Sequence, residues 1–484
     1  MSAGLRISVK QVDVRPKISH AALLTGAQTM RGVFRLLFAV IVARQLGPQQ
    51  FGVYAVLFAL VELVAVASGS GYADYLTREA ARDQRVGWGL ARQLIVLRVL
   101  VAIPLVTIVL AVLWFLGFSR GVLVTGALAC LTLIPRSFSE AVQGVLRGIH
   151  QYKGYFAIES ALGTTLLAGA AVLAIRHGGL RQAILAEIPA ATVAGLVALG
   201  LGLKFKTRET VGFTASRLIK NSAVFNLYSF IGTLYDRFDV LLLSKLAGEY
   251  ATGIYSVAYR ALGMTQIIAY GALYSLLPSL SRNSGSIDER QRFEKALGVL
   301  LSAAFVVVLG TMVFAGPVVK LVLGPAYAES ALALKVLIWA VILRYVNYAL
   351  NVSLLAGGHE RVFVTTSLVC LGTNIVGNLI FIPLYSWKAA AGVTIVTEFV
   401  LLIQNAWWLR RIVGKIPMPF KSLQISVAFA ATMGLAVGGG RFVSPLLIGT
   451  ACVLTFIVYL YYTGIVREIA TVWDGVRTVG EISS

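Results

Sequence analysis

Long apolar segments separated by short polar turns make up most of this chain. Each is about 20 residues long, enough for an α-helix to cross the hydrocarbon core of a bilayer. The runs are nearly continuous rather than alternating, which favours helices over the strands of a membrane β-barrel. The fourteen predicted spans are 21–43, 51–71, 94–117, 121–143, 154–175, 182–203, 223–243, 252–279, 296–319, 331–356, 362–384, 389–409, 422–440 and 442–464.

Composition supports the same fold class. Of the 484 residues, 58% are hydrophobic and only 13% are charged, whereas a soluble domain is about half apolar and a quarter charged. The formal charge is +21, but the basic residues are dispersed between apolar blocks instead of forming one patch. This distribution argues against a nucleic-acid partner. We therefore predict an all-α polytopic membrane protein with about 14 transmembrane helices.

The distribution of basic residues predicts the orientation. With the N-terminus inside, 26 lysines and arginines fall in the inner segments and seven in the outer loops. Cytoplasmic segments are enriched in these residues, so both termini are expected to be cytoplasmic. The seven outer residues are Arg44, Arg120, Arg176, Arg181, Lys245, Lys388 and Arg441.

Sequence signals for catalysis are absent. No P-loop, GxSxG or HExxH pattern occurs, and the four histidines are scattered. The outer loops are short, whereas a membrane glycosyltransferase or polymerase usually needs a sizeable extracytoplasmic loop or domain. We therefore expect no enzyme activity, no catalytic residues, no metal site and no cofactor.

A short motif occurs twice. Leu46-Gly47-Pro48-Gln49-Gln50-Phe51-Gly52-Val53-Tyr54 joins spans one and two, and Leu246-Ala247-Gly248-Glu249-Tyr250-Ala251-Thr252-Gly253-Ile254-Tyr255 joins spans seven and eight. A repeat of six helices predicts two six-helix bundles related by pseudo-two-fold symmetry, followed by two C-terminal helices. The expected division is a cytoplasmic segment 1–20, a first bundle 21–203, a linker 204–222, a second bundle 223–409, two additional helices within 422–464 and a cytoplasmic tail 465–484.

The first motif, with Thr77-Arg78-Glu79-Ala80-Ala81-Arg82 after it, resembles the opening of oligosaccharide flippases. Similar pieces follow in the second half: Tyr235-Asp236-Arg237-Phe238-Asp239, Gly253-Ile254-Tyr255, Leu277-Pro278-Ser279 and Val322-Leu323-Gly324-Pro325-Ala326-Tyr327. This family belongs to the multidrug/oligosaccharidyl-lipid/polysaccharide exporter superfamily, and the resemblance covers roughly residues 20–410. It implies two six-helix bundles in a V and a lipid-linked oligosaccharide as cargo.

Nine basic residues lie within or at the edges of the spans. Arg98, Lys320 and Lys335 are within about two turns of a predicted end, from which they can reach the interface. Arg136, beside Pro135, remains open. The remaining five basic residues lie at or near the centres of their spans: Arg31, Arg35, Arg237, Arg260 and Arg344.

Arg31 and Arg35 are four residues apart and so share one face of the first span. Guanidinium groups at bilayer depth require a partner or a wet cavity. A pyrophosphate suits them because guanidinium matches phosphate oxygens in a bidentate manner. We predict that Arg31, Arg35, Arg237, Arg260 and Arg344 bind the substrate pyrophosphate. The alternative is internal pairing with carboxylates such as Glu62, Glu140, Glu159, Glu187 or Glu398.

Asp236 and Asp239 share one face of span seven. With Glu62 they are candidates for coupling transport to Na⁺ or H⁺. An equally open interpretation has the aspartates form salt bridges to Arg31 or Arg35 that hold a closed state together.

The leading functional interpretation is a flippase that moves an undecaprenyl-pyrophosphate-linked oligosaccharide, of the O-antigen, capsule or exopolysaccharide kind, by alternating access. The lipid and the sugar follow from the resemblance, and the embedded arginines independently indicate an anionic cargo. The alternatives are a Na⁺- or H⁺-coupled multidrug exporter of the same superfamily and, less favoured, a polymerase or membrane glycosyltransferase. The expected setting is the bacterial cytoplasmic membrane, with membrane lipids and a polymerase or chain-length complex as partners.

Overall fold

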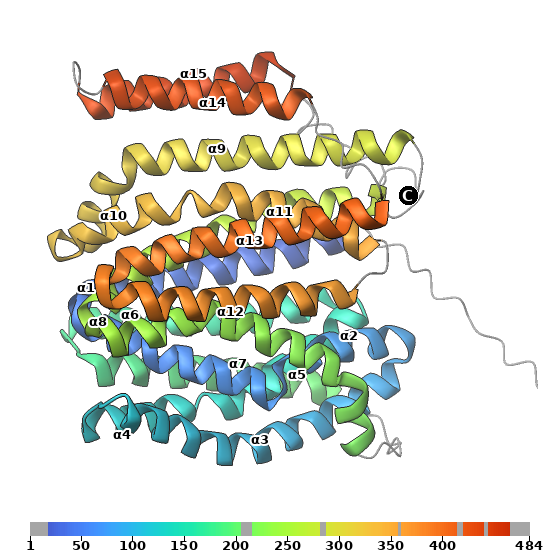
Figure 1. The fold of residues 1–484 in the computed structure, drawn as a ribbon. Coiled ribbons are helices and arrows are strands. Elements are labelled where there is room, and N and C mark those ends of the chain that lie inside the picture. Colours follow the sequence, from blue (N-terminus) through green and yellow to red (C-terminus); the bar gives the residue numbers. More distant parts are fainter. Residues whose placement is uncertain are drawn as a thin grey trace, which may run out of the picture.

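The structure of the chain is a computed structural model. It describes residues 18–204, 215–280, 287–356, 360–413, 420–439 and 444–464. These residues are almost entirely helical, and no strand occurs among them (Figure 1). Helices are expected here because, in lipid, every backbone N–H and C=O must find its partner within the segment.

The first half of the chain forms one group of helices. They are α1 (Ile18–Ala65), η1 (Val66–Ser70), α2 (Tyr72–Arg82), α3 (Gln84–Phe115), α4 (Arg120–Cys130), α5 (Leu133–Gly148), α6 (Tyr152–Ile175) and α7 (Leu180–Lys204).

The second half repeats this order and adds two helices at the end. They are α8 (Ala215–Leu280), α9 (Ile287–Leu323), η2 (Pro325–Tyr327), α10 (Ala328–Leu337), α11 (Ala340–Ala356), α12 (Glu360–Tyr385), α13 (Trp387–Val413), α14 (Phe420–Gly439) and α15 (Pro445–Tyr462).

Many of these helices are suited to a membrane. Nine within the described ranges are long and apolar enough to cross one, or ten if the bent pair α10–α11 counts as a single span. The first of the nine, Gly26–Gly69, covers most of two predicted spans, 21–43 and 51–71. The chain is therefore a multi-pass membrane protein.

Two long helices contain sharp turns at glycine. Gly47 divides α1 (φ 69°, ψ 170°), and Gly248 divides α8 (φ 84°, ψ 174°). Glycine adopts such left-handed φ values without the steric cost that a Cβ imposes. These two glycines belong to the repeated motif, so the motif marks the same helical reversal in both halves.

Further features recur in the same order in each half. Gly117 after α3 corresponds to Gly324 after α9, and His177 after α6 to Ser386 after α12; all four have positive φ. The fourth predicted span is interrupted between α4 and α5, and the tenth is bent by 42° between α10 and α11. These correspondences extend the internal repeat well beyond the sequence motif.

The two halves meet along α1 and α8 (Figure 1). A Cβ at Gly52 would lie 1.9 Å from the backbone oxygen of Glu249, and one at Gly253 would lie 1.8 Å from that of Pro48. The helices therefore cross with their backbones in contact, as small residues permit in membranes. At the other end, a Cβ at Gly71 would lie 2.7 Å from Cα of Asn226.

The last two helices, α14 and α15, lie beside α9 at one edge of the molecule (Figure 1). The ring of Phe305 on α9 stacks on Phe429 of α14 with centroids 4.2 Å apart, and it meets Phe456 of α15 edge to face. This position is peripheral to the contact between the halves.

The predicted domain limits remain predictions. Two of the expected segments, 1–20 and 465–484, lie wholly or almost wholly outside the described residues. The predicted linker 204–222 overlaps the start of α8, which begins at Ala215.

Candidate substrate-binding cavities

A cavity lies within the first group of helices, between α1, α5, α6 and α7. Its volume is about 70 Å³, and we refer to it as the first-bundle cavity. Its lining holds three arginines, three glutamates and several neutral polar side chains. The charged residues are Arg31, Arg35, Arg136, Glu140, Glu159 and Glu187.

Arg31 is only partly neutralised in this cavity. One of its terminal nitrogens lies 3.4 Å from a carboxylate oxygen of Glu159, and Gln143 donates to the same oxygen at 2.9 Å. The Arg31 side chain is 45% exposed, whereas Glu159 is 2% exposed. Because an arginine carries five N–H donors, this single long contact leaves most of them available to a ligand.

Arg35 lines the same cavity one helical turn further along α1. Within the described ranges it forms no ion pair and no hydrogen bond. An unpaired guanidinium inside a membrane helix bundle is costly unless water or an anion reaches it. Arg35 therefore gives the cavity a guanidinium whose donors are available to an anion.

A third arginine enters the cavity from α5, at the position that sequence reasoning left open. Arg136 lies 3.3 Å from Glu140, which also accepts from Arg98 at 2.7 Å. Pro135 sits in the first turn of α5, where a proline is tolerated, and its missing N–H is consistent with the break after α4. The proline next to an intramembrane arginine was the sequence signal for this residue.

The expectation that Arg98 reaches the membrane interface is wrong. Only 1% of this residue is exposed, and it forms the ion pair with Glu140. The physical reason is that α3 continues from Gln84, so Arg98 lies several turns from either end of that helix.

A second cavity, which we call the interbundle cavity, lies between α1 and α8. Its volume is about 50 Å³, and its lining includes Glu62, Arg237, Ser256, Tyr259 and Arg260. Nε of Arg237 lies 2.5 Å from a carboxylate oxygen of Glu62, so this ion pair joins the two halves.

Arg260 also contacts the other half. Its guanidinium lies over the rings of Phe51 and Tyr54 on α1, 5.5 and 5.6 Å from their centroids. Cation–π contacts of this length stabilise a cation without neutralising its charge. Two of the predicted arginines, Arg237 and Arg260, are thus brought together in the interbundle cavity, as Arg31 and Arg35 are in the first.

The fifth predicted residue, Arg344, lies apart from these four. It is buried and its Nε is 2.7 Å from Glu398, which also accepts from Asn347. Asn405 in turn donates to Asn347 at 3.2 Å. The predicted contact between Arg344 and a pyrophosphate remains a prediction.

The two aspartates of α8 are bound by tyrosines. Tyr259 donates to Asp236 at 3.1 Å, and Tyr255 donates to Asp239 while lying 3.2 Å from the Thr394 hydroxyl. Asp239 is 2% exposed. In the described part of the chain neither aspartate pairs with Arg31 or Arg35, so the predicted alternative of such salt bridges is not seen.

The comparisons with known proteins place this architecture in one class. The fold is similar to that of the lipid II flippase MurJ in an inward closed conformation, with a TM-score of 0.71 and 14% identity over 91% of this chain and 99% of that one. It is also similar to an inward-facing multidrug resistance MATE transporter of the MOP superfamily, with a TM-score of 0.65 and 14% identity over 82% and 98% of the two chains. The chain therefore shares its fold with these flippase and MATE structures.

The family follows from the sequence itself. A family model described as polysaccharide biosynthesis protein matches residues 19–284, more than half of the chain, and the chain belongs to that family. It is 22% identical to a probable low-salt glycan biosynthesis flippase, Agl15, of Haloferax volcanii, over 87% of this chain and 88% of that protein. It is 24% identical to the capsular polysaccharide biosynthesis protein CapF of Staphylococcus aureus, over 38% and 47% of the two.

These findings confirm the predicted family resemblance and the predicted fold class of two helical bundles with additional C-terminal helices. The protein is a flippase-like membrane transporter of polysaccharide biosynthesis.

Proposed function

We propose that the protein is a flippase that carries an undecaprenyl-pyrophosphate-linked oligosaccharide across the bacterial cytoplasmic membrane. The observation that carries the proposal is Arg35, an unpaired guanidinium one turn from the weakly paired Arg31 in the first-bundle cavity. Two arginines so placed can hold both phosphates of a pyrophosphate, which is the part of the cargo that differs most from the lipid.

The glutamates of this cavity fit the rest of the cargo. Glu159 is held by Arg31 and Gln143, and Glu187 accepts from the Tyr54 hydroxyl, so neither forms an ion pair with Arg35. Carboxylate, amide and hydroxyl groups are also the usual hydrogen-bond partners of sugar hydroxyls. In the proposed complex the pyrophosphate lies at the arginines, the glycan occupies the polar space that opens when the bundles move apart, and the polyprenyl tail remains in lipid.

In the proposed mechanism, the ion pair between Glu62 and Arg237 links substrate binding to movement of the two bundles. The pair joins α1 to α8, and residues of both helices line the cavity beside it. A phosphate that reaches Arg237 replaces Glu62 as its partner, and the two halves then lose one of their mutual attractions. The bundles can rock apart around the bound substrate, as expected for alternating access in a protein with internal repeats.

Asp236, Asp239 and Glu62 are the proposed ion-coupling residues. Asp239 is buried and accepts from a tyrosine rather than from a cation, so protonation or Na⁺ binding would change its charge without breaking an ion pair. No resident cofactor, metal or catalytic residue is part of the proposal. Cytoplasmic termini and an association with a polymerase or chain-length complex complete it.

The second candidate is an ion-coupled multidrug exporter, which the similarity in fold to MATE transporters favours. Organic cations would be held by an acidic or apolar cavity. Arg35, which has no carboxylate partner in the described residues, supports the flippase instead. A polymerase or glycosyltransferase fits less well, because the helices are joined by short turns such as those at Gly117, His177 and Ser386.

The function can be tested in cells from which the protein has been depleted. Lipid-linked oligosaccharide should accumulate on the cytoplasmic leaflet and be cleared by the wild type, but not by Arg31→Ala/Arg35→Ala expressed at the same level. A double variant that restores export fully would overturn the assigned site. An absence of accumulation, with raised sensitivity to cationic dyes, would favour the exporter.

A further inference from the structure

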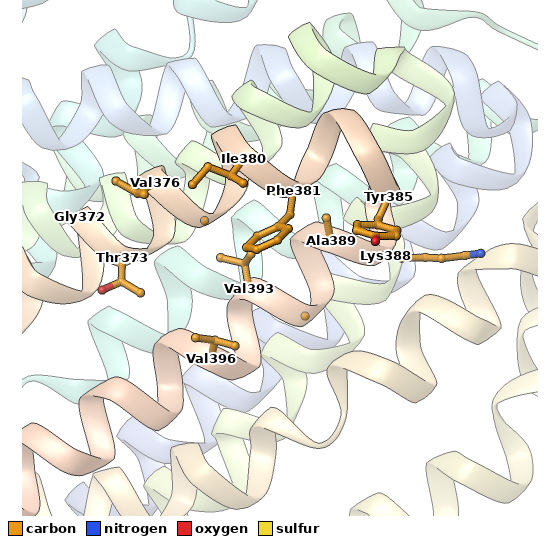
Figure 2. A pocket seen from close by; sticks show the side chains of 12 residues that line it. Gly372, Thr373, Val376, Ile380, Phe381, Tyr385, Lys388, Ala389, Val393 and Val396 are labelled. Atoms are coloured by element: carbon orange, nitrogen blue, oxygen red, sulfur yellow. The ribbon is translucent and has the colours of Figure 1, made fainter.

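An open groove runs along the outer surface of α12 and α13, apart from both charged cavities. Its volume is about 730 Å³, and aliphatic and aromatic side chains make up most of its lining (Figure 2). Gly372 and Thr373 lie at one end, and Tyr385 and Lys388 at the other (Figure 2). Both helices are among those suited to crossing the membrane, so the groove faces lipid.

Glycines create the hollow. A Cβ added at Gly372 or at Gly392 would meet no protein atom within 4 Å. These two glycines are therefore not required for close packing between helices, although glycine weakens a helix relative to alanine. Gly377 differs, because its Cβ would lie 3.1 Å from Val393, where the two helices touch at the floor of the groove.

The end of the groove at the turn between α12 and α13 is polar and positively charged. Lys388 is the one charged residue of the lining, and it forms no ion pair within the described ranges. Its ammonium lies 5.7 Å from the ring centroid of Trp387, whose Nε1 donates to Glu329 at 2.9 Å and fixes the turn. Tyr385, which also lines this end, is exposed.

The length of the groove matches the thickness of one lipid leaflet. Gly372 and Tyr385 are separated by about 20 Å along α12 at 1.5 Å per residue. Half of a hydrocarbon core is about 15 Å thick, and a headgroup phosphate lies just beyond it. An apolar channel of this length with a cation at its polar end is complementary to one acyl chain and one phosphate.

We propose that this groove binds one anionic phospholipid from the leaflet on the Lys388 side, which the predicted orientation makes the outer leaflet. An acyl chain lies along Gly372, Gly377 and Gly392, and the phosphate meets the Lys388 ammonium and the Tyr385 hydroxyl. The site holds a lipid of the surrounding bilayer, so it does not depend on the proposed transport function. A polyprenyl chain is much longer than the groove, which favours the acyl chain as the occupant.

The test uses purified, delipidated full-length protein and native mass spectrometry. Phosphatidylglycerol and phosphatidylcholine with identical acyl chains are added, and the lipids that remain bound are counted. We expect one phosphatidylglycerol to bind at least tenfold more tightly than phosphatidylcholine. Lys388→Gln should reduce this preference to near unity, and Gly392→Leu should remove the bound lipid of either kind.

Gly434→Leu on α14 is the matched control, because a Cβ there also meets nothing within 4 Å and the position is exposed but lines no part of this groove. It should bind lipid as the wild type does, and a thermal unfolding curve for each variant verifies folding. The proposal is overturned if a folded Gly392→Leu protein retains the lipid, or if Lys388→Gln keeps the full preference for phosphatidylglycerol. Displacement of phosphatidylglycerol by an equimolar polyprenyl phosphate would also overturn it, since the polyprenyl lipid would then be the occupant.

Discussion

Nε of Arg237 lies 2.5 Å from a carboxylate oxygen of Glu62, and this ion pair connects α8 in one half of the protein to α1 in the other. Both side chains are about one-third exposed and line the interbundle cavity. The pair thus contributes to the contact between the halves and is accessible to a competing anion.

Replacing Glu62 tests this competition. Glu62→Gln leaves Arg237 without its counter-ion, so a soluble pyrophosphate-linked sugar should bind about three- to tenfold more tightly, the effect of roughly 1 kcal/mol from a partly exposed pair. Arg237→Ala should weaken binding by a similar factor. Titration calorimetry of the detergent-solubilised protein measures both.

The control for this pair is Glu79→Gln, which removes a carboxylate that pairs with Arg78 and Arg82 at the surface. It should leave binding unchanged. Equal losses of affinity in Glu62→Gln and Arg237→Ala would contradict the account, because the carboxylate would then support the site instead of competing for it.

Gly52→Ala should hinder closure of the protein at the crossing of α1 and α8. The new Cβ would lie 1.9 Å from the backbone oxygen of Glu249, a distance that neither backbone can accommodate without moving. Spin labels at Arg176 and Lys388, on turns of opposite halves, should report a longer or broader distance distribution by electron paramagnetic resonance.

Gly232→Ala on α8 serves as the control for that experiment, because its Cβ would have no neighbour within 4 Å. Its distance distribution should match that of the wild type. If Gly52→Ala gives that same distribution, the close crossing of the two helices does not define the closed state.

Arg344→Leu separates a structural role from the predicted substrate contact. Removing one partner of a buried ion pair leaves Glu398 uncompensated and should lower the free energy of unfolding by about 3–5 kcal/mol. The double variant Arg344→Leu/Glu398→Leu should recover much of that loss. A stable Arg344→Leu protein with weakened substrate binding would instead support Arg344 as a pyrophosphate ligand.

Asp239→Asn tests ion coupling. The amide can still accept the hydrogen bond from Tyr255, but it can no longer change charge. Transport in proteoliposomes should then become independent of an imposed Na⁺ or pH gradient, whereas Asp74→Asn, which alters a mostly exposed carboxylate, should keep the wild-type dependence. Retained gradient dependence in Asp239→Asn would exclude this residue from coupling.

The sequence was sufficient for the fold because membrane insertion imposes strong constraints on composition and length. Apolar runs located the helices, and the Gly47 and Gly248 motifs revealed the repeat. Sequence could not show that Arg98 is buried, since that depends on Glu140 of another helix. Nor could it distinguish the unpaired Arg35 from the paired Arg344, because both are central arginines and only the tertiary structure brings Glu398 to one of them.

The most direct test of the central claim is the rate at which purified protein in proteoliposomes moves a pyrophosphate-linked oligosaccharide lipid between leaflets. Arg35→Ala should reduce transport at subsaturating substrate about tenfold to a hundredfold, the value of one to two hydrogen bonds to a charged group. Arg176→Ala, which removes an exposed arginine on a turn, should transport at the wild-type rate. Equal rates for Arg35→Ala and the wild type would contradict the assignment of the first-bundle cavity as the pyrophosphate site.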